Sequence, residues 1–136
     1  MNNIPDGFKL ANFSGGFLET NGPYYIKEKG GRWLVGQRVE KQHVNYLGIA
    51  HGGMLSTLAD VALSYQPYVS EHPNPSVTTT SLTTNFVLGA KLGDWIVGDA
   101  IIDRLSKRTA HVHGAITCGD EVLLTMSGVF GIYRPS

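Results

Sequence analysis

The chain has 136 residues, with 11 basic and 11 acidic side chains and a formal net charge of zero. Its length predicts one domain, and it has no basic run or tail of the kind that binds nucleic acid. Its apolar runs are too short to cross a bilayer, and its N-terminus does not follow a signal-peptide pattern. The lone Cys118 excludes an internal disulfide and provides no metal-site spacing. We therefore expect a soluble cytoplasmic protein that binds neither nucleic acid nor membranes.

The N-terminal half is predicted to lead into one helix. Residues 1–30 are rich in Gly, Asn and aromatic side chains, and we interpret them as a glycine-punctuated lead-in with at most a short helical turn. A strand is predicted over residues 33–39, followed by a loop over 41–50. An amphipathic helix is expected over about 52–65, because Pro67 would stop it and disfavours helical backbone at the residue before it.

The C-terminal half is predicted to consist of strands. Residues 76–87 are rich in Thr and suit a half-buried strand. Further strands are predicted over 95–103 and 108–118, the latter with alternating apolar and polar positions. A tight turn at Gly119-Asp120 leads into a last strand over 122–133. We expect these strands to pair as an antiparallel meander.

Glycines occupy the expected helix start, and a carboxylate follows two turns later. A helix start offers unpaired backbone N–H groups and a positive partial charge, and Gly52 leaves room for a ligand oxygen to reach them. A carboxylate near such a backbone is typical of acid–base or nucleophilic chemistry on a carbonyl. At 1.5 Å per residue, however, Asp60 lies roughly 12 Å along the axis from Gly52, so one helix cannot direct both groups at the same atom.

One face of the predicted helix carries small polar residues where a solvent-facing side would carry Lys, Glu, Arg or Gln. Its members are Gly53, Ser56, Thr57, Asp60 and Ser64. Such a face suits close approach by another element, either the rest of the chain or a second subunit. We therefore predict that Asp60 is partly enclosed. From the helix alone, an ordinary core or interface aspartate is an equally good interpretation.

The stretch from Asn45 to Asp60 reads Asn-x-x-Gly-x-x-His-Gly-Gly, with an Asp seven residues after the second glycine. It resembles the signature of hotdog-fold acyl-CoA thioesterases of the PaaI-like, phenylacetate-pathway group, and the resemblance extends over about 32–133. It implies an α+β hotdog fold, in which an antiparallel sheet wraps around one long helix, as a single domain over 1–136. It also implies homodimers with shared active sites, expected to pair again as homotetramers. No cofactor is implied, since coenzyme A is part of the substrate.

The resemblance also implies roles for the central residues. The Gly52 backbone N–H would polarise the thioester carbonyl, and Asp60 of the partner subunit would act as general base or nucleophile. Thr79 matches the position that holds the water. A slip of one residue would select Thr78 or Thr80 instead, although it would also turn the side chain to the other face.

The resemblance assigns the remaining site residues less directly. Asn45 matches an amide near the thiolate leaving group, and His51 matches the histidine that shapes this corner. Gly53 is expected to contact substrate. Lys107 and Arg108, at a predicted turn, are candidates for binding the nucleotide end of coenzyme A, although solvated turn charges are an equally good interpretation.

Alternative functions remain open at this point. A non-catalytic acyl-CoA sensor would keep the fold but lose the carboxylate, so Asp60 argues against it. Hotdog hydratases use an Asp and a His five residues apart, and here Tyr65 stands at the second position. A purely structural dimer would have no use for the glycine pair. Aryl, short-chain, long-chain and carrier-protein thioesters all remain possible substrates.

Overall fold

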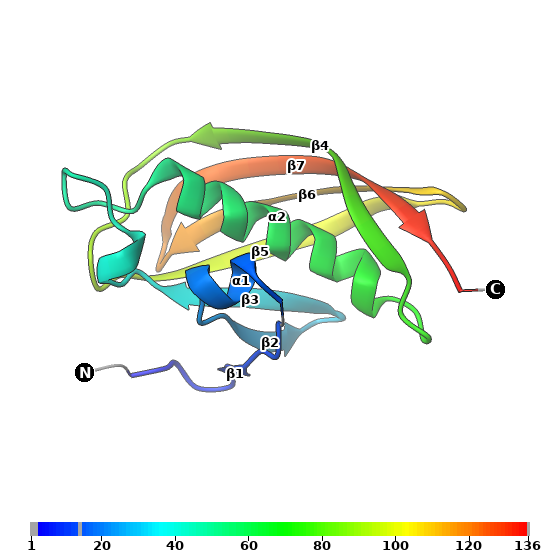
Figure 1. Cartoon of the computed structure of the whole chain (residues 1–136), viewed down its shortest axis with the longest axis horizontal. Coiled ribbons are helices and arrows are strands. Elements are labelled where there is room, and N and C mark those ends of the chain that lie inside the picture. The colour runs from blue at the N-terminus through cyan, green and yellow to red at the C-terminus, as the bar shows by residue number, and fades with distance from the viewer. Residues whose placement is uncertain (1–2, 14, 136) are drawn as a thin grey trace.

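The computed structural model describes residues 3–13 and 15–135. Figure 1 shows a long helix lying across a curved antiparallel sheet. The helical elements are α1 (Phe17–Asn21), the 3-10 turn η1 (Lys41–His43) and α2 (Gly52–Val69). The strands are β1 (Lys9–Leu10), β2 (Tyr25–Lys29), β3 (Arg32–Arg38), β4 (Ser76–Phe86), β5 (Trp95–Leu105), β6 (Thr109–Cys118) and β7 (Glu121–Tyr133). The expected hotdog architecture of one main helix and one wrapping sheet is confirmed.

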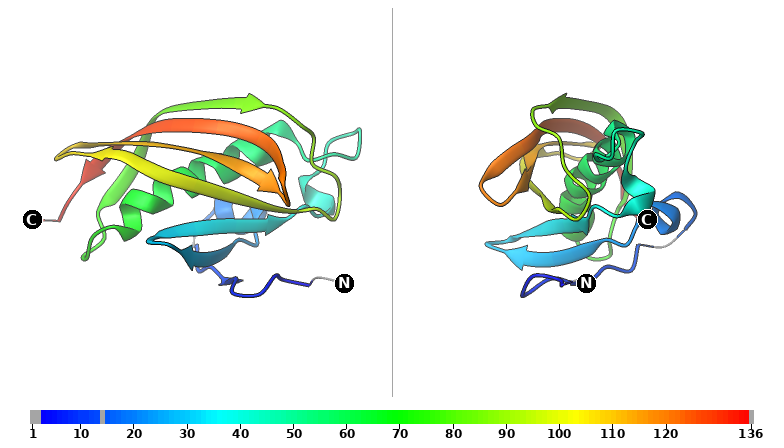
Figure 2. Two further views of the ribbon diagram at one scale, coloured as in Figure 1. Left: turned by 180° about the vertical axis from the view of Figure 1, so that it is seen from behind. Right: turned by 90° about the vertical axis from the view of Figure 1, so that its left-hand side faces the viewer.

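The sheet order is β1-β2-β3-β5-β6-β7-β4, and every neighbouring pair is antiparallel. The predicted meander is confirmed for β5, β6 and β7. The strand β4, however, pairs with β7 at the far edge of the sheet and not with β5, the next strand in the chain. In the right-hand view of Figure 2 the sheet curls around α2, with β4 on one side and α1 at the opening.

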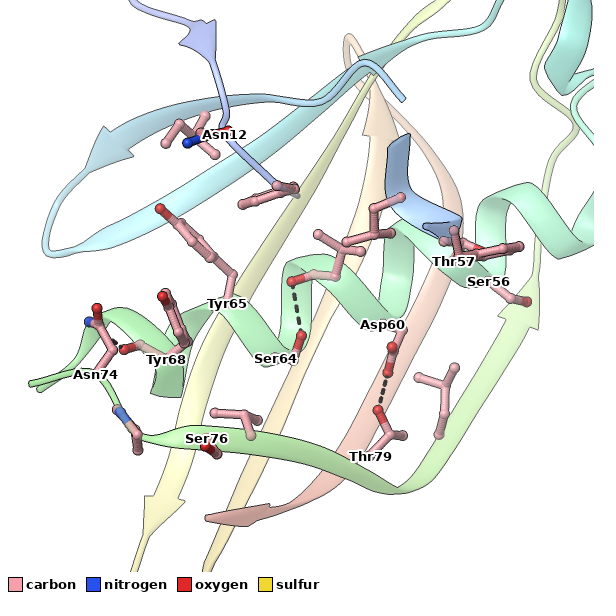
Figure 3. Close-up of a pocket in the computed structure, with 18 of the residues that line it drawn as sticks. Asn12, Ser56, Thr57, Asp60, Ser64, Tyr65, Tyr68, Asn74, Ser76 and Thr79 are labelled. Carbon is pink, nitrogen blue, oxygen red and sulfur yellow. Dashed lines mark hydrogen bonds between the residues drawn. The ribbon is translucent and has the colours of Figure 1, made fainter. Parts of the chain in front are cut away.

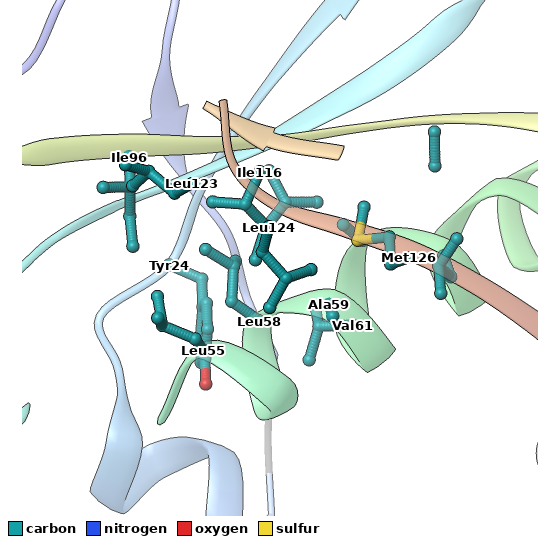
Figure 4. Packing of buried hydrophobic residues seen from close by; sticks show 14 of the residues in the cluster. Tyr24, Leu55, Leu58, Ala59, Val61, Ile96, Ile116, Leu123, Leu124 and Met126 are labelled. Atoms are coloured by element: carbon teal, nitrogen blue, oxygen red, sulfur yellow. The ribbon is translucent and has the colours of Figure 1, made fainter. Parts of the chain in front are cut away.

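The core fills the space between α2 and the concave face of the sheet. Figure 4 shows Leu58 of α2 beside Leu124 of β7, and Leu55 and Leu123 belong to the same buried cluster. Gly98 of β5 is essential to this packing, because a Cβ there would lie 2.5 Å from the Cβ of Ala62. The helix can therefore approach the sheet closely only where that strand has no side chain. Within the described residues, no helix is long and apolar enough to span a membrane.

Helix α2 continues through Pro67 to Val69, so its predicted end at Tyr65 is wrong. Gln66 explains the difference. Its side-chain amide donates to the Trp33 carbonyl at 2.7 Å and to the Ala62 carbonyl at 2.9 Å, and its Oε1 accepts from the Trp33 N–H at 3.0 Å. These buried bonds hold helical backbone at the residue before a proline, where local sterics oppose it.

The core also begins before the predicted boundary near residue 32. Tyr24 is 3% exposed and Ile26 is 8% exposed, and both belong to the main cluster. The lead-in therefore contains a core strand, β2, paired with β3 through a hairpin at Gly30-Gly31. Gly30 and Gly31 have φ of 58° and 84°, as a tight hairpin turn requires. Their sequence therefore indicates a hairpin between two strands, which the interpretation of residues 1–30 as a lead-in does not include.

Candidate active site in the α2–β4 groove

Asp60 and Thr79 meet across the gap between α2 and β4. The Thr79 hydroxyl donates a 2.6 Å hydrogen bond to Asp60 Oδ1 (Figure 3). Thr79 faces the helix as Val77 does, two residues earlier on the same face of β4, and a bulge in the β4–β7 pairing follows between Thr79 and Ser81. Among the three threonines considered, the structure therefore brings Thr79 to the carboxylate. Asp60 is half-buried, and its Oδ2 accepts no hydrogen bond from the described part of the chain.

The Asp60–Thr79 pair opens into a groove of about 1480 Å³, which we call the α2–β4 groove. The small polar face of α2 forms its floor, as Figure 3 shows for Ser56, Thr57 and Ser64. The N-terminal segment and α1 form one wall, and β4 forms the other. The prediction that Asp60 is partly enclosed is confirmed, and this chain alone provides part of the enclosure.

The end of the groove toward the C-terminus of α2 is aromatic. Phe13 packs edge-on against Tyr65 with 5.3 Å between ring centroids, and Tyr65 stacks on Tyr68 at 6.0 Å. All three rings line the groove. Burial, and to a smaller extent the nearby Tyr68, raises the pKa of Tyr65, so its hydroxyl stays neutral. This end provides a flat, uncharged surface suited to an apolar group.

His51 caps the N-terminus of α2. Its Nδ1 accepts from the Gly53 N–H at 2.8 Å, and its carbonyl accepts from Leu55. A Cβ on Gly53 would lie 3.0 Å from that same Nδ1. An alanine at the second glycine of the motif would therefore crowd the capping ring, and the Gly53 N–H is already bonded to the imidazole.

Gly52 has a different environment. Within the described residues its N–H makes no hydrogen bond, and a Cβ there would meet Phe86 at an ordinary 3.6 Å. Its φ is not positive, so neither the backbone conformation nor packing within the chain requires glycine. A free N–H at the first position of a helix remains available to an external oxygen.

Asn45 has its side chain fixed by the loop that precedes α2. Its Oδ1 accepts from the N–H groups of Leu47 at 2.9 Å and Ile49 at 3.4 Å. Gly48 closes this turn with φ of 79°, a conformation that favours glycine. Because Oδ1 faces two donors, the orientation of the amide is determined. Its Nδ2 has no partner in the part of the chain that the structure describes, so it can donate to a ligand.

The structure does not bring every predicted site residue together within one chain. Gly52 and Asp60 both lie on α2, two turns apart. Lys107 and Arg108 lie beside the β5–β6 turn, where their carbonyls bond to Arg134 and Ile132, and neither side chain lines the α2–β4 groove. Their role in binding coenzyme A stays a prediction.

Two observations concern histidines outside the motif. His113 pairs with Asp103 at 2.7 Å on the exposed face of the sheet. In residues 3–13 and 15–135, no cluster of three or more His, Cys, Asp or Glu side chains has the arrangement of a metal site. His43 lies within the predicted loop over 41–50, yet it is only 2% exposed and forms part of a polar cluster with Gln37. Its sequence position carries no signal of this burial.

Comparisons with known proteins agree with this geometry. The model of the thioesterase superfamily matches residues 47–125, which include the whole of α2 and β4. A candidate esterase of Pseudomonas aeruginosa is 36% identical over 131 residues, covering 96% of this chain and 98% of that protein. The chain belongs to the thioesterase superfamily.

Two solved structures show the same fold. The BH2602 protein of Bacillus halodurans, crystallised with CoA, has a TM-score of 0.73 and 24% identity, covering 82% of this chain and 74% of that one. The PaaI protein of the phenylacetic acid degradation operon of E. coli has a TM-score of 0.70 and 21% identity, with coverage of 78% and 75%. At these identities the likeness concerns the hotdog fold alone, and the family model is what confirms the resemblance to thioesterases.

Proposed function

We propose that this protein hydrolyses an acyl-CoA thioester to a free acid and coenzyme A. The observation that carries the proposal is the Asp60 carboxylate, bonded to Thr79 through one oxygen and free at the other, on the floor of a large groove. Membership of the thioesterase superfamily supports the reaction class. The CoA bound by the relative from Bacillus halodurans supports the thiol component.

In the proposed reaction, Asp60 takes a proton from water, and the water oxygen attacks the thioester carbonyl carbon. The carbonyl oxygen, as it becomes negative, is stabilised by the Gly52 N–H. The carbon–sulfur bond then breaks, and the departing sulfur receives the proton from Asp60. Asn45 Nδ2 donates a hydrogen bond to that sulfur. Direct attack by Asp60, with an anhydride that water then cleaves, uses the same residues, and neither route requires a cofactor.

We propose that each active site combines Gly52 of one subunit with Asp60 of its partner. The separation of roughly 12 Å along one helix supports this arrangement. The outer edge of β4 is unpaired within the described residues, and antiparallel pairing with a second copy would extend the sheet. Phe86, Val87 and Leu88 at the end of this edge are 47–60% exposed and would be covered. Pairing of two dimers into a tetramer is part of the proposal.

The acyl group is proposed to lie at the aromatic end of the groove, against Phe13, Tyr65 and Tyr68. These rings offer apolar surface in the same groove as the reacting carboxylate, and Phe17 and Leu18 of α1 extend that surface for longer groups. Lys107 and Arg108 are proposed to meet the phosphates of coenzyme A from outside the groove.

The test is a panel of aryl-CoA and acyl-CoA thioesters of increasing chain length, assayed with wild type, Asp60→Asn and Asp120→Asn. Asp120 is an exposed turn aspartate and provides the matched control. We expect wild type and Asp120→Asn to release coenzyme A at equal rates and Asp60→Asn to release none above background. Full activity in folded Asp60→Asn would refute the assignment. Binding of acyl-CoA by wild type without any hydrolysis would favour a sensor.

A further inference from the structure

His43 is a buried histidine whose two ring nitrogens have different partners. Its Nδ1 accepts from the Glu40 backbone N–H at 2.9 Å, so the ring proton lies on Nε2. Nε2 donates to the Asn21 carbonyl at 2.7 Å and faces the Gly22 carbonyl at 3.3 Å. The three contacts fit the neutral ring in one tautomer and one orientation.

On the Nε2 side, His43 anchors the end of helix α1. The Asn21 carbonyl, at the last residue of α1, also accepts from Gln37 Nε2 at 2.6 Å. Two buried side chains thus converge on one carbonyl at this point. Helix α1 carries Phe17 and Leu18, which line the α2–β4 groove, so the anchor positions a wall of the groove.

On its backbone and Nδ1 side, His43 closes the loop that precedes α2. Its carbonyl accepts from the His51 N–H at 2.8 Å, and His51 caps the helix that begins at Gly52. The loop between them carries Asn45, whose N–H donates to the Ile49 carbonyl at 2.8 Å. The position of the His43 backbone, which the Nδ1 bond to Glu40 helps to hold, therefore bears on the loop that carries Asn45 and leads to Gly52.

We propose that His43 is a positioning residue that holds both the α1 wall of the groove and the loop presenting Asn45 and Gly52. Its two ring nitrogens divide this work, since Nε2 holds α1 and Nδ1 holds the start of the loop at Glu40. The expected effect of His43 on catalysis rests on the proposed function. Its role in holding α1 and the loop does not depend on that function.

The two nitrogens can be tested separately. In His43→Asn, the side-chain oxygen replaces the Nδ1 acceptor and the bond to Asn21 is lost. In His43→Gln, the amide nitrogen replaces the Nε2 donor and the bond to Glu40 is lost. Gln66→Met is the matched control, because it removes a buried polar side chain that contacts neither α1 nor the loop.

The first readout is amide hydrogen exchange followed by peptide mass spectrometry. His43→Asn is expected to speed exchange in peptides covering 17–22 and to leave those covering 40–52 near wild type, whereas His43→Gln is expected to do the reverse. Loss of one hydrogen bond corresponds to about a fivefold change in exchange rate. The proposal would be overturned if both segments exchanged at the wild-type rate in both variants, if the two variants changed both segments alike, or if Gln66→Met produced the same change.

The second readout compares how each His43 variant changes KM and how it changes kcat, with rates expressed per folded dimer. His43→Asn is expected to raise KM about fivefold for long or aryl acyl groups but not for acetyl-CoA, since the small acyl group does not reach α1. His43→Gln is expected to lower kcat by a similar factor with KM unchanged. Proportional effects on all substrates would refute the division. Wild type inactive on every thioester would instead contradict the proposed function, with hydrogen exchange still deciding the role of His43.

Discussion

Replacing Gly52 with proline removes one hydrogen-bond donor while leaving the helix that carries it. Gly52 is the first helical residue of α2, a position where proline is favoured because its missing N–H has no partner within the helix. The preceding residue, His51, has φ of −63° and ψ of 139°, a conformation compatible with a following proline. We therefore expect Gly52→Pro to fold and dimerise, with a change in stability below about 1 kcal/mol.

The expected effect on catalysis is large. Loss of a backbone donor to a developing oxyanion lowers kcat by about 10²–10³-fold, equivalent to about 3–4 kcal/mol. Gly52→Ala is the matched control, because it keeps the N–H and its Cβ would sit 3.6 Å from Phe86 without a clash. We expect it to retain activity within about threefold of wild type. The pair of variants thus isolates the N–H group from the effect of adding a side chain.

The assay is the initial rate of coenzyme A release, followed with a thiol reagent after subtraction of the Cys118 signal, for samples of equal melting temperature. Mixing Gly52→Pro chains with Asp60→Asn chains adds a second measurement. Each mixed dimer would contain one intact site if Gly52 and Asp60 act across the interface, restoring about a quarter of wild-type activity per chain. The reasoning is refuted if Gly52→Pro matches Gly52→Ala, and the shared site is refuted if the mixture stays inactive after exchange of subunits.

Three further outcomes follow from the same structure. Thr79→Val should lower kcat about tenfold or more by removing the charge-assisted bond to Asp60, whereas Thr83→Val on the same strand should match wild type; equal rates for the two variants would dismiss the role of Thr79. Burial raises the pKa of Tyr24 to about 12, an effect partly offset by Gln37. Folding therefore favours the protonated phenol, and up to about 2 kcal/mol of stability should be lost as the pH rises from 10 to 12. Denaturant titrations should show a smaller alkaline loss in Tyr24→Phe; an identical loss would rule out this source. Burial, followed by nearby carboxylates, raises the pKa of Cys118. Its alkylation at pH 8 should be slower than that of an unstructured cysteine peptide, and equal rates would contradict the shift.

The parts of the site that depend on short sequence spacing could be predicted before the structure. Asp60 and Gly52 stand out by their positions in one helix, and the resemblance points to Thr79, which the structure brings into contact with Asp60. The ends of the strands from β3 onward lie within about two residues of their predicted positions. Alternation of apolar and polar residues determines which face of a strand is buried, so a short window of sequence contains the necessary information.

The parts that depend on contacts between distant segments could not be predicted. Gln66 keeps α2 helical through a bond to Trp33, 33 positions away, which overrides the local preference of Pro67. The burial of His43 depends on a carbonyl 22 positions earlier, at Asn21. A polar residue has the same appearance in the sequence whether it faces solvent or a buried partner, so its environment emerges only when the chain has folded.

The cap at the start of α2 makes two positions of the motif dependent on each other. A side chain at Gly53 would crowd the ring of His51, whose Nδ1 would lie 3.0 Å from the new Cβ. Scanning one position at a time would therefore make Gly53 look intolerant of alanine for reasons of catalysis. A double replacement, His51→Ser with Gly53→Ala, removes the crowding and keeps a capping oxygen. Whether position 53 accepts a side chain thus depends on the residue at position 51. An engineered library would reach the double variant only by changing both codons together.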